Sequence, residues 1–364
     1  MISTTFIMEQ HIGHRSYYEN LRRNVDQSAS IRPEWVEVTY QGSWGETKSL
    51  RFIPESLRGS LDGRAQVRDA LMHTNSEITF FNTQVPAALG GSLARKRPYV
   101  LSTDITPRQY DSMAEMYGHN PDVGGLISRY KHFINKKLFQ GAARLVPWSS
   151  WAAESIIDDY DVEPNKVEVL SPGVDVDFWI PAGNPENERM RILFIGGDYH
   201  RKGGPDLMAA FHSLPENMVE LVLVTSSAIE AGDGVTVYND MKPNTPELVA
   251  LGQSCDVFVL PSKAEAFGIA AVEASSLGLP VIGAKIGGFG DIVSDGENGY
   301  LISTGDQGAL AQQLRILAEN PAKRQAFGNA SREKAITKFD ARKNTSRLID
   351  ILYEVKRNST RVTF

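Results

Sequence analysis

The stretch DVFVLPSKAEAFGIAAVEASSLGLPVIGAKI, residues 256–286, contains two short apolar runs with a helical segment between them. Phe267 and Gly268 begin the helix, and Gly278 ends it before Pro280, in the order typical of a glycine C-cap followed by proline. Strand, helix and strand in succession predict parallel strands joined by a crossover helix.

The same alternation of apolar runs and amphipathic stretches continues along the chain and predicts an α/β protein with parallel sheets. Residues 179–190, WIPAGNPENERM, have no periodicity and separate two sets of runs, so we interpret them as an interdomain linker. The segment from about residue 339 has apolar positions at helical spacing and predicts a C-terminal helix. The predicted strands lie at 36–40, 77–81, 99–103, 144–149 and 166–172 before the linker, and at 191–197, 219–226, 235–240, 256–262 and 280–286 after it.

The composition is that of a globular protein long enough for two domains. The chain has 364 residues, of which 41% are hydrophobic and 23% charged, and its net charge of -6 argues against nucleic-acid binding. Cys255 is the only cysteine, so a disulfide within the chain is excluded and a structural zinc site has no thiolates. The N-terminal residues lack a signal-peptide pattern and no run of about 18 apolar residues occurs, so we expect a cytoplasmic protein.

Two predicted strands end in loops whose residues suit an anionic ligand. Arg201 and Lys202 follow the strand that ends near residue 197, and ligands of open α/β sheets bind beyond the carboxyl ends of strands. The helix that starts at Phe267 and Gly268 offers free N–H groups to a phosphate. The ordinary alternative for the first loop is a solvated turn with surface charges.

Two carboxylates, Glu265 and Glu273, lie eight residues apart around the start of this helix. Carboxylate oxygens only accept hydrogen bonds, so sugar hydroxyls are suitable partners for them. We expect Glu273 to bind a ribose diol and Glu265 a hexose. The alternative is a carboxylate at a helix N-terminus beside a surface glutamate.

Taken together, these segments resemble the retaining glycosyltransferases of family four, which have the GT-B fold. The resemblance rests on NKVEVLSPGVDVDFW (165–179), on the Glu-x7-Glu pair, on the Pro-Ser-x3-Glu-x-Phe-Gly loop (261–268) and on two glycine turns within 287–299. It is strong from about residue 166 to 303 and weaker before that. It implies two Rossmann-like domains facing a cleft: an acceptor-binding domain (1–178) and a nucleotide-sugar-binding domain (188–335), with a C-terminal helix (336–364) that packs back on the first domain.

The resemblance also implies roles for residues of the second domain. Lys202 would bind the donor diphosphate, Glu265 the donor sugar and Glu273 the nucleotide ribose. Family members usually have an arginine at the position of Gly197, and the adjacent Arg201 is the natural substitute for it. The expected catalytic residues are Glu265, Lys202, Arg201 and Asp104, and the expected donor-binding residues are Gly13, Gly197, Lys202, Phe267, Gly268, Ile269 and Glu273.

In the first half, EQHIGHRSYYENLRR (9–23) resembles the family's glycine-containing loop after the first strand. The family often has a His-Asp pair at the end of a later strand, where this chain has Thr103 and Asp104. Asp104 keeps a hydrogen-bonding role in this comparison, whereas the histidine is missing. We place His11, His14 and Thr103 on the acceptor side.

Residues 125–145 predict a helix with Arg129, Lys131, Lys136 and Lys137 opposite an apolar face. Such a face is suited to anionic lipid at the inner face of a membrane or to an anionic acceptor. An amphipathic core helix with a solvated basic side is the alternative.

The sequence therefore predicts transfer of a sugar, with retention, from a nucleotide diphosphate sugar to a hydroxyl of a glycan, glycolipid or small-molecule acceptor. The resemblance implies no cofactor and no bound metal ion. Two alternatives remain open: a nucleotide-sugar-binding subunit without catalysis, and a sugar-nucleotide epimerase or phosphorylase on the same fold.

Overall fold

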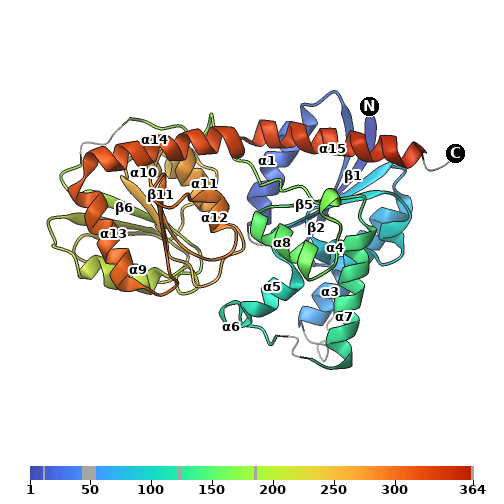
Figure 1. Cartoon of the computed structure of the whole chain (residues 1–364), viewed down its shortest axis with the longest axis horizontal. Helices are drawn as coiled ribbons and strands as arrows, with labels where there is room; N and C mark the ends of the chain where they lie inside the picture. The colour runs from blue at the N-terminus through green and yellow to red at the C-terminus, as the bar shows by residue number, and fades with distance from the viewer. Residues whose placement is uncertain (11–12, 43–54, 122–123, 184–186, 362–364) are drawn as a thin grey trace. The chain divides into compact units, whose positions relative to one another are not determined.

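The structure is a computed structural model that describes residues 1–10, 13–42, 55–121, 124–183 and 187–361 (Figure 1). The chain divides into two compact units. Unit 1 consists of Met1–Ser112, Pro121–Gly173 and Arg342–Phe364, and unit 2 consists of Met113–Asn120 and Val174–Ala341.

Unit 1 is built on a five-stranded parallel sheet in the order β2-β1-β3-β4-β5. Strand β1 is buried on both faces, as expected of a strand inside a parallel sheet covered by helices. The chain runs from β1 to β2 on one side and continues at β3 on the other, so the strand order reverses between β1 and β3. The elements are β1 (Ile2–Glu9), α1 (His14–Asp26), β2 (Ile31–Val38), α3 (Glu55–His73), β3 (Ile78–Phe81), α4 (Gln84–Gly90), η2 (Leu93–Arg95), β4 (Tyr99–Thr103), α5 (Pro107–Ser112), α7 (Gly125–Gly141), β5 (Arg144–Pro147), α8 (Ser150–Asp158), η3 (Pro164–Lys166) and α15 (Ala341–Arg361).

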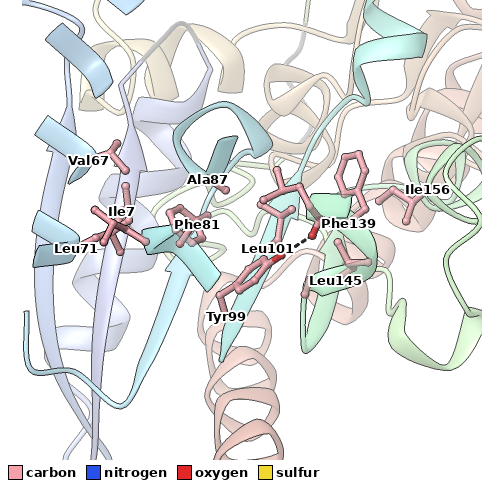
Figure 2. Packing of buried hydrophobic residues seen from close by; sticks show 14 of the residues in the cluster. Ile7, Val67, Leu71, Phe81, Ala87, Tyr99, Leu101, Phe139, Leu145 and Ile156 are labelled. Atoms are coloured by element: carbon pink, nitrogen blue, oxygen red, sulfur yellow. Dashed lines mark hydrogen bonds between the residues drawn. The ribbon is translucent and has the colours of Figure 1, made fainter. Parts of the chain in front are cut away.

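The core of unit 1 lies between this sheet and its helices (Figure 2). Side chains of the strands, such as Ile7, Phe81 and Leu145, pack with Leu71 of α3 and Phe139 of α7. The Tyr99 hydroxyl is buried among them and donates a hydrogen bond to the carbonyl of Leu138, which satisfies its polar group. The C-terminal half of α7 is thereby fixed to the sheet.

Helix α15 packs on unit 1 through polar contacts along its length. Arg347 donates two hydrogen bonds, of 2.6 and 2.8 Å, to the carboxylate of Glu168. Further along, Tyr353 donates to the carbonyl of Ser30 and Lys356 pairs with Glu77 at 2.7 Å. The last helix of the chain is therefore part of the first unit.

Unit 2 contains a six-stranded parallel sheet in the order β11-β10-β9-β6-β7-β8. The chain fills the β6-β7-β8 side first and then returns to β9 on the other side of β6, so the order reverses between β6 and β9. The elements are α6 (Ala114–Tyr117), β6 (Met190–Ile195), α9 (Gly204–His212), β7 (Val219–Val224), β8 (Val235–Tyr238), α10 (Pro246–Gln253), β9 (Val257–Leu260), α11 (Ile269–Ser276), β10 (Val281–Ala284), α12 (Phe289–Ile292), β11 (Gly299–Ile302), α13 (Gln307–Glu319) and α14 (Pro321–Lys338).

Side-chain caps fix the starts of several helices in unit 2. Thr245, Asp306 and Asn320 each accept a hydrogen bond from the backbone N–H three residues later, at the starts of α10, α13 and α14. A cap of this kind typically contributes about 1 kcal/mol because it satisfies an N–H that the helix leaves free. These local signals agree with the tertiary fold.

The predicted fold class and C-terminal helix are confirmed, whereas one predicted strand is wrong. Residues 166–172 form no strand: Val167 makes only an isolated bridge to Leu145. The N–H groups of Glu168 and Leu170 donate to β5, but the segment completes no regular ladder. Strands β1 and β11 were not among the predicted strands. The segment interpreted as a linker begins inside unit 2, whose boundary falls between Gly173 and Val174.

Candidate functional site

The loops after β6 and β9 meet where the strand order of the six-stranded sheet reverses. Lys202, in the loop after β6, donates a hydrogen bond and pairs with the carboxylate of Glu265, in the loop after β9. Ser262 donates to the same carboxylate oxygen at 3.3 Å. A switch point of this kind is the usual ligand site of an open parallel sheet, so the structure brings two predicted site residues together there.

Glycines allow these loops to approach each other. Gly203 has φ +78°, and a Cβ there would lie 2.0 Å from the carbonyl oxygen of Pro261. Gly287 has φ +56°, and its Cβ would lie 2.0 Å from the carbonyl oxygen of Glu265. A larger residue at either position would therefore push apart the backbone that holds Glu265.

The Arg201 side chain is anchored within unit 2. It donates to the carbonyl of Ala264 at 3.0 Å and pairs with Asp198 at 3.3 Å. Its guanidinium also lies over the ring of Tyr117, 5.1 Å from the centroid. Tyr117 was not predicted from the sequence; it belongs to a short segment, Met113–Asn120, that packs with unit 2.

Gly197 lies in the same loop, and its carbonyl accepts hydrogen bonds from the hydroxyls of Thr225, Ser226 and Ser227. A Cβ at Gly197 would meet only the Ser226 hydroxyl, at 3.5 Å. The position is therefore fixed through its carbonyl and has room for a side chain.

Helix α11 begins beside Glu265 with an uncapped N-terminus. Gly268 precedes the helix with φ +100°, and no side chain caps the first turn, which contains no acidic residue. Phe267 is buried, and a Cβ at Gly268 would clash with the ring of Phe289 at 2.8 Å. The N–H of Ala271 already donates to the Gly268 carbonyl, so the N–H groups of Ile269 and Ala270 are left for an anion.

Glu273 lies on α11 with only 5% of its surface exposed. Burial raises the pKa of its carboxyl from 4.5 to about 8. Among the described residues, none donates a hydrogen bond to this carboxyl group. A buried polar group without a partner is a candidate for ligand binding.

The carboxyl edge of the five-stranded sheet carries a second polar cluster, where β1 and β3 separate. Asn82 bridges the strands, since its amide oxygen accepts from Glu9 N–H at 2.7 Å and its amide nitrogen donates to the Glu9 carbonyl. Thr83 donates to the carboxylate of Glu9, which is buried. This cluster was not predicted from the sequence, although an acidic residue at the end of a buried strand was a usable signal.

Asp104 follows β4 at this edge and pairs with His14, the first residue of α1, with 3.5 Å between Nε2 and Oδ2. Gly13 precedes the helix with φ +87° and open space around its Cβ position. Thr103, in contrast, is fully buried and donates to Gln84 at 2.6 Å, so its hydroxyl serves the packing of unit 1. His11 lies outside the described residues.

The predicted site residues thus form two groups, one at the switch point of each sheet. The group in unit 2 combines a cation, the carboxylate of Glu265, the buried carboxyl group of Glu273 and free helix N–H groups, which suits a ligand with phosphates and hydroxyls. Among the described residues, no cluster of three or more His, Cys, Asp or Glu side chains is arranged to hold a metal ion. None of the described helices is long and apolar enough to cross a membrane.

Comparisons with known proteins agree with this chemistry. The family model of glycosyl transferases group 1 matches residues 175–334. The D-inositol 3-phosphate glycosyltransferase of Arthrobacter sp. (strain FB24) is 28% identical over 303 residues, which cover 77% of this chain and 71% of that protein.

Two solved structures show a similar fold. The sucrose-phosphate synthase of Thermosynechococcus elongatus has a TM-score of 0.75 at 17% identity, covering 98% of this chain and 99% of that one. Anabaena HepE in complex with UDP-glucose has a TM-score of 0.71 at 17% identity, covering 97% of this chain and 100% of that one.

Proposed function

Because the chain belongs to the group 1 glycosyltransferases and has the GT-B fold, we propose that it transfers a sugar from a nucleotide diphosphate sugar to an acceptor hydroxyl. The observation that carries the proposal is the pairing of Lys202 with Glu265 at the switch point of the six-stranded sheet. A cation for the diphosphate and a carboxylate for the sugar are the two groups that such a donor needs side by side.

Lys202 and the N-terminus of α11 bind the diphosphate in this proposal. Negative charge grows on the diphosphate as the sugar leaves, and fixed positive groups stabilise it most in the transition state. Gly268 and Ile269 contribute backbone N–H groups at the uncapped start of the helix. Arg201, although anchored to Ala264 and Tyr117, adds positive charge to the same loop.

The two glutamates divide the rest of the donor. Glu265 binds the transferred sugar. The carboxyl group of Glu273 forms hydrogen bonds with the ribose diol. The buried carboxyl of Glu273, which has no partner among the described residues, supports its role as a ligand contact. Gly197 and Phe267 shape the loops around the donor.

We further propose that the reaction proceeds with retention and without a metal ion. The bond between C1 of the sugar and the phosphate oxygen breaks while the acceptor oxygen bonds to C1 on the same face. The departing diphosphate takes the acceptor proton. Lys202 and the helix N–H groups supply the charge stabilisation that a metal ion would otherwise give.

The acceptor is, in this proposal, a phosphorylated or lipid-linked hydroxyl compound. The Arthrobacter relative is named for D-inositol 3-phosphate, so a phosphorylated polyol is the first soluble acceptor to test. UDP-glucose, present in the HepE structure, is the first donor to test.

We also propose that the enzyme is cytoplasmic and contacts the inner face of a membrane through α7. The first half of this helix exposes four large apolar side chains, at Leu126, Ile127, Tyr130 and Phe133. An exposed apolar helix face usually binds a partner. The helix has no acidic residue and carries Arg129, Lys131, Lys136 and Lys137, which favours an anionic lipid surface.

Vesicle sedimentation tests this contact. We expect the protein to bind vesicles that contain anionic lipid. Binding should be weaker with purely zwitterionic vesicles and at high salt. The Leu126→Ser and Phe133→Ser variants should bind less, whereas Val169→Ser, at another exposed apolar position, should bind like the wild type. Equal binding by all variants would contradict the proposal.

Product analysis tests the catalytic proposal. The purified protein, UDP-glucose and a panel of acceptors should give a glycosylated product with the anomeric configuration of the donor, observed by NMR, and chelation of divalent ions should leave the rate unchanged. Inversion at C1 would overturn retention alone. Donor binding without transfer or hydrolysis would favour a non-catalytic binding subunit, and free isomerised or phosphorolysed sugar would favour an epimerase or phosphorylase.

A further inference from the structure

Arg201 connects the loop after β6 with the loop after β9 at two points, both within unit 2. Its backbone carbonyl accepts a hydrogen bond from the N–H of Lys263 at 2.8 Å. Its guanidinium donates to the carbonyl of Ala264 at 3.0 Å. This second contact ends at the peptide bond that joins Ala264 to Glu265, so it holds the backbone immediately before the carboxylate that is proposed to bind the sugar.

The carbonyl of Ala264 depends on this arginine. Ala264 is fully buried, and among the described residues Arg201 is the only one that donates to its carbonyl. A buried carbonyl that loses its hydrogen bond is destabilised, so the backbone around it shifts toward another partner or water. Such a shift moves Glu265, whose carboxylate pairs with Lys202.

The Arg201 side chain is itself held by its surroundings. One carboxylate oxygen of Asp198 accepts from Nε of Arg201 at 3.3 Å, and the other accepts from the backbone N–H of Arg201 at 3.1 Å. The guanidinium also lies over the ring of Tyr117, and only 14% of the side chain is exposed. Movement of the guanidinium toward a phosphate would therefore break contacts that hold the loop.

We propose that Arg201 is a positioning residue for sugar transfer, which fixes Glu265 through the carbonyl of Ala264 rather than by direct contact with the diphosphate. The inference rests on the proposed function, because it concerns how the carboxylate that binds the sugar is held. A small displacement of a group that contacts the reacting sugar lowers the rate strongly. Lys202 and the N-terminus of α11 remain the groups that bind the diphosphate.

Steady-state kinetics of two variants test the proposal. Arg201→Ala should lower kcat about tenfold to a hundredfold, because Glu265 is displaced, and should change the KM for the donor much less. Arg201→Lys keeps the charge, but its ammonium cannot reproduce the planar fork that bonds Asp198 and Ala264 together, so it should recover only part of the rate. Wild-type rates in Arg201→Lys would show that charge alone suffices and would overturn the proposal.

Arg189→Ala is the matched control for these assays. Arg189 also belongs to unit 2, where it pairs with the carboxylate of Glu220 and donates to the carbonyl of Glu216 at 3.3 Å. It lies just before β6, at the opposite end of the strand from the loop that contains Arg201. Its removal takes away the same kinds of contact without touching the site, so this variant should keep the wild-type kcat.

A double variant and nucleotide binding separate positioning from direct charge stabilisation. If Arg201 acts through Glu265, then Arg201→Ala should cost little more once Glu265→Gln has removed the carboxylate. The difference between the Tm shifts caused by UDP and by UMP should stay at its wild-type value in Arg201→Ala, because Lys202 and α11 bind the second phosphate. Fully additive losses, or loss of the difference between UDP and UMP, would overturn the proposal.

Hydrogen exchange of the ligand-free protein separates this inference from the proposed function. The backbone amides of residues 262–268 should exchange faster in Arg201→Ala than in the wild type or in Arg189→Ala, because the loop has lost a buried hydrogen bond. A wild type that binds UDP but transfers no sugar would overturn the proposed function and this inference with it. An active wild type whose exchange in this segment is unchanged by Arg201→Ala would overturn the inference alone.

Discussion

The Lys202–Glu265 pair couples the two groups that carry the donor in the proposed reaction. With 17% and 8% of their side chains exposed, neither charge is well solvated without the other. Removal of one partner from a buried pair leaves the other charge uncompensated, which is more harmful than removal of both. Mutation of either residue therefore alters the environment of its partner as well as its own contact.

Lys202→Ala should lower kcat about a hundredfold or more, as removal of a single charge-stabilising donor does in other enzymes. Glu265→Gln should lower kcat more than it raises the KM for the donor, because the carboxylate faces developing positive charge. The double variant should lose less than the sum of both effects. Lys263→Ala, which removes the neighbouring lysine paired with Asp206, is the control for steady-state assays. A Lys202→Ala enzyme with wild-type rates would refute the role of the pair.

Glu273 makes stability depend on pH. The folded protein holds its proton up to about pH 8, whereas the unfolded chain releases it near pH 4.5. The folded state therefore binds more protons in this interval, so the free energy of unfolding falls as pH rises from about 4.5 to 8. Glu273→Gln has no such proton, and its Tm relative to wild type should increase across this interval. Parallel curves of Tm against pH would contradict the raised pKa.

The sequence predicts which loops carry the candidate site residues, but it does not predict every side-chain contact of those residues. The proximity of Lys202 and Glu265 was predictable because both follow strands of one parallel sheet, whose carboxyl ends lie at the same edge. Their roles and that of Glu273 in ligand binding stay predictions. The contact of Arg201 with Tyr117 was not predictable, because a cation–ring contact between distant segments depends on how Met113–Asn120 packs with unit 2. Thr103 was assigned to the acceptor side from its position, whereas its hydroxyl bonds Gln84.

At the scale of elements, the loops after β6 and β9 function as a pair because glycine allows close backbone contact. Gly203→Ala should lower the stability of unit 2 by about 1–3 kcal/mol, since it combines a left-handed backbone with overpacking against Pro261. Gly197→Ala, in the same loop, should leave Tm unchanged because space is available for its Cβ. Calorimetry of both variants checks this, and equal Tm values for Gly203→Ala and wild type would show that the loop adjusts.

Element prediction succeeded where apolar runs are continuous; it failed at two sheet edges and at the central strand β1 (ISTTFIME), whose run is interrupted by Ser3, Thr4 and Thr5. Strand β9 (VFVL) is buried on both faces and has no polar interruption. Residues 166–172 have the composition of a strand, yet they bond β5 at only a few positions. Strand β11 (GYLI) is short and only partly buried, so its apolar signal is weak. Edge segments depend on a single neighbour, which sequence patterns do not reveal.

At the scale of the whole molecule, each sheet has its own switch point with its own polar cluster. The cluster in unit 2 contains Lys202 and Glu265, which suit a nucleotide diphosphate sugar. The cluster in unit 1 consists of the His14–Asp104 pair and the hydrogen bond from Thr83 to Glu9. Alternation of strands and helices predicted two such sheets, and the family resemblance implied that the C-terminal helix packs on the first one. The assignment of Met113–Asn120 to unit 2 was not predicted, because it depends on tertiary contacts.

This division predicts that nucleoside diphosphates stabilise unit 2. A ligand at a hundred times its Kd adds about 2.7 kcal/mol to the folded state, which corresponds to a rise of about 5–10 °C in the Tm of a domain of this size. Differential scanning calorimetry with UDP and UMP should show a larger shift for UDP, because Lys202 and the N-terminus of α11 meet the second phosphate. Lys202→Ala should reduce the difference between the two nucleotides, whereas Lys263→Ala should preserve it. Equal shifts for UDP and UMP in the wild type would mean that these groups do not bind the diphosphate, even if the protein binds the nucleoside.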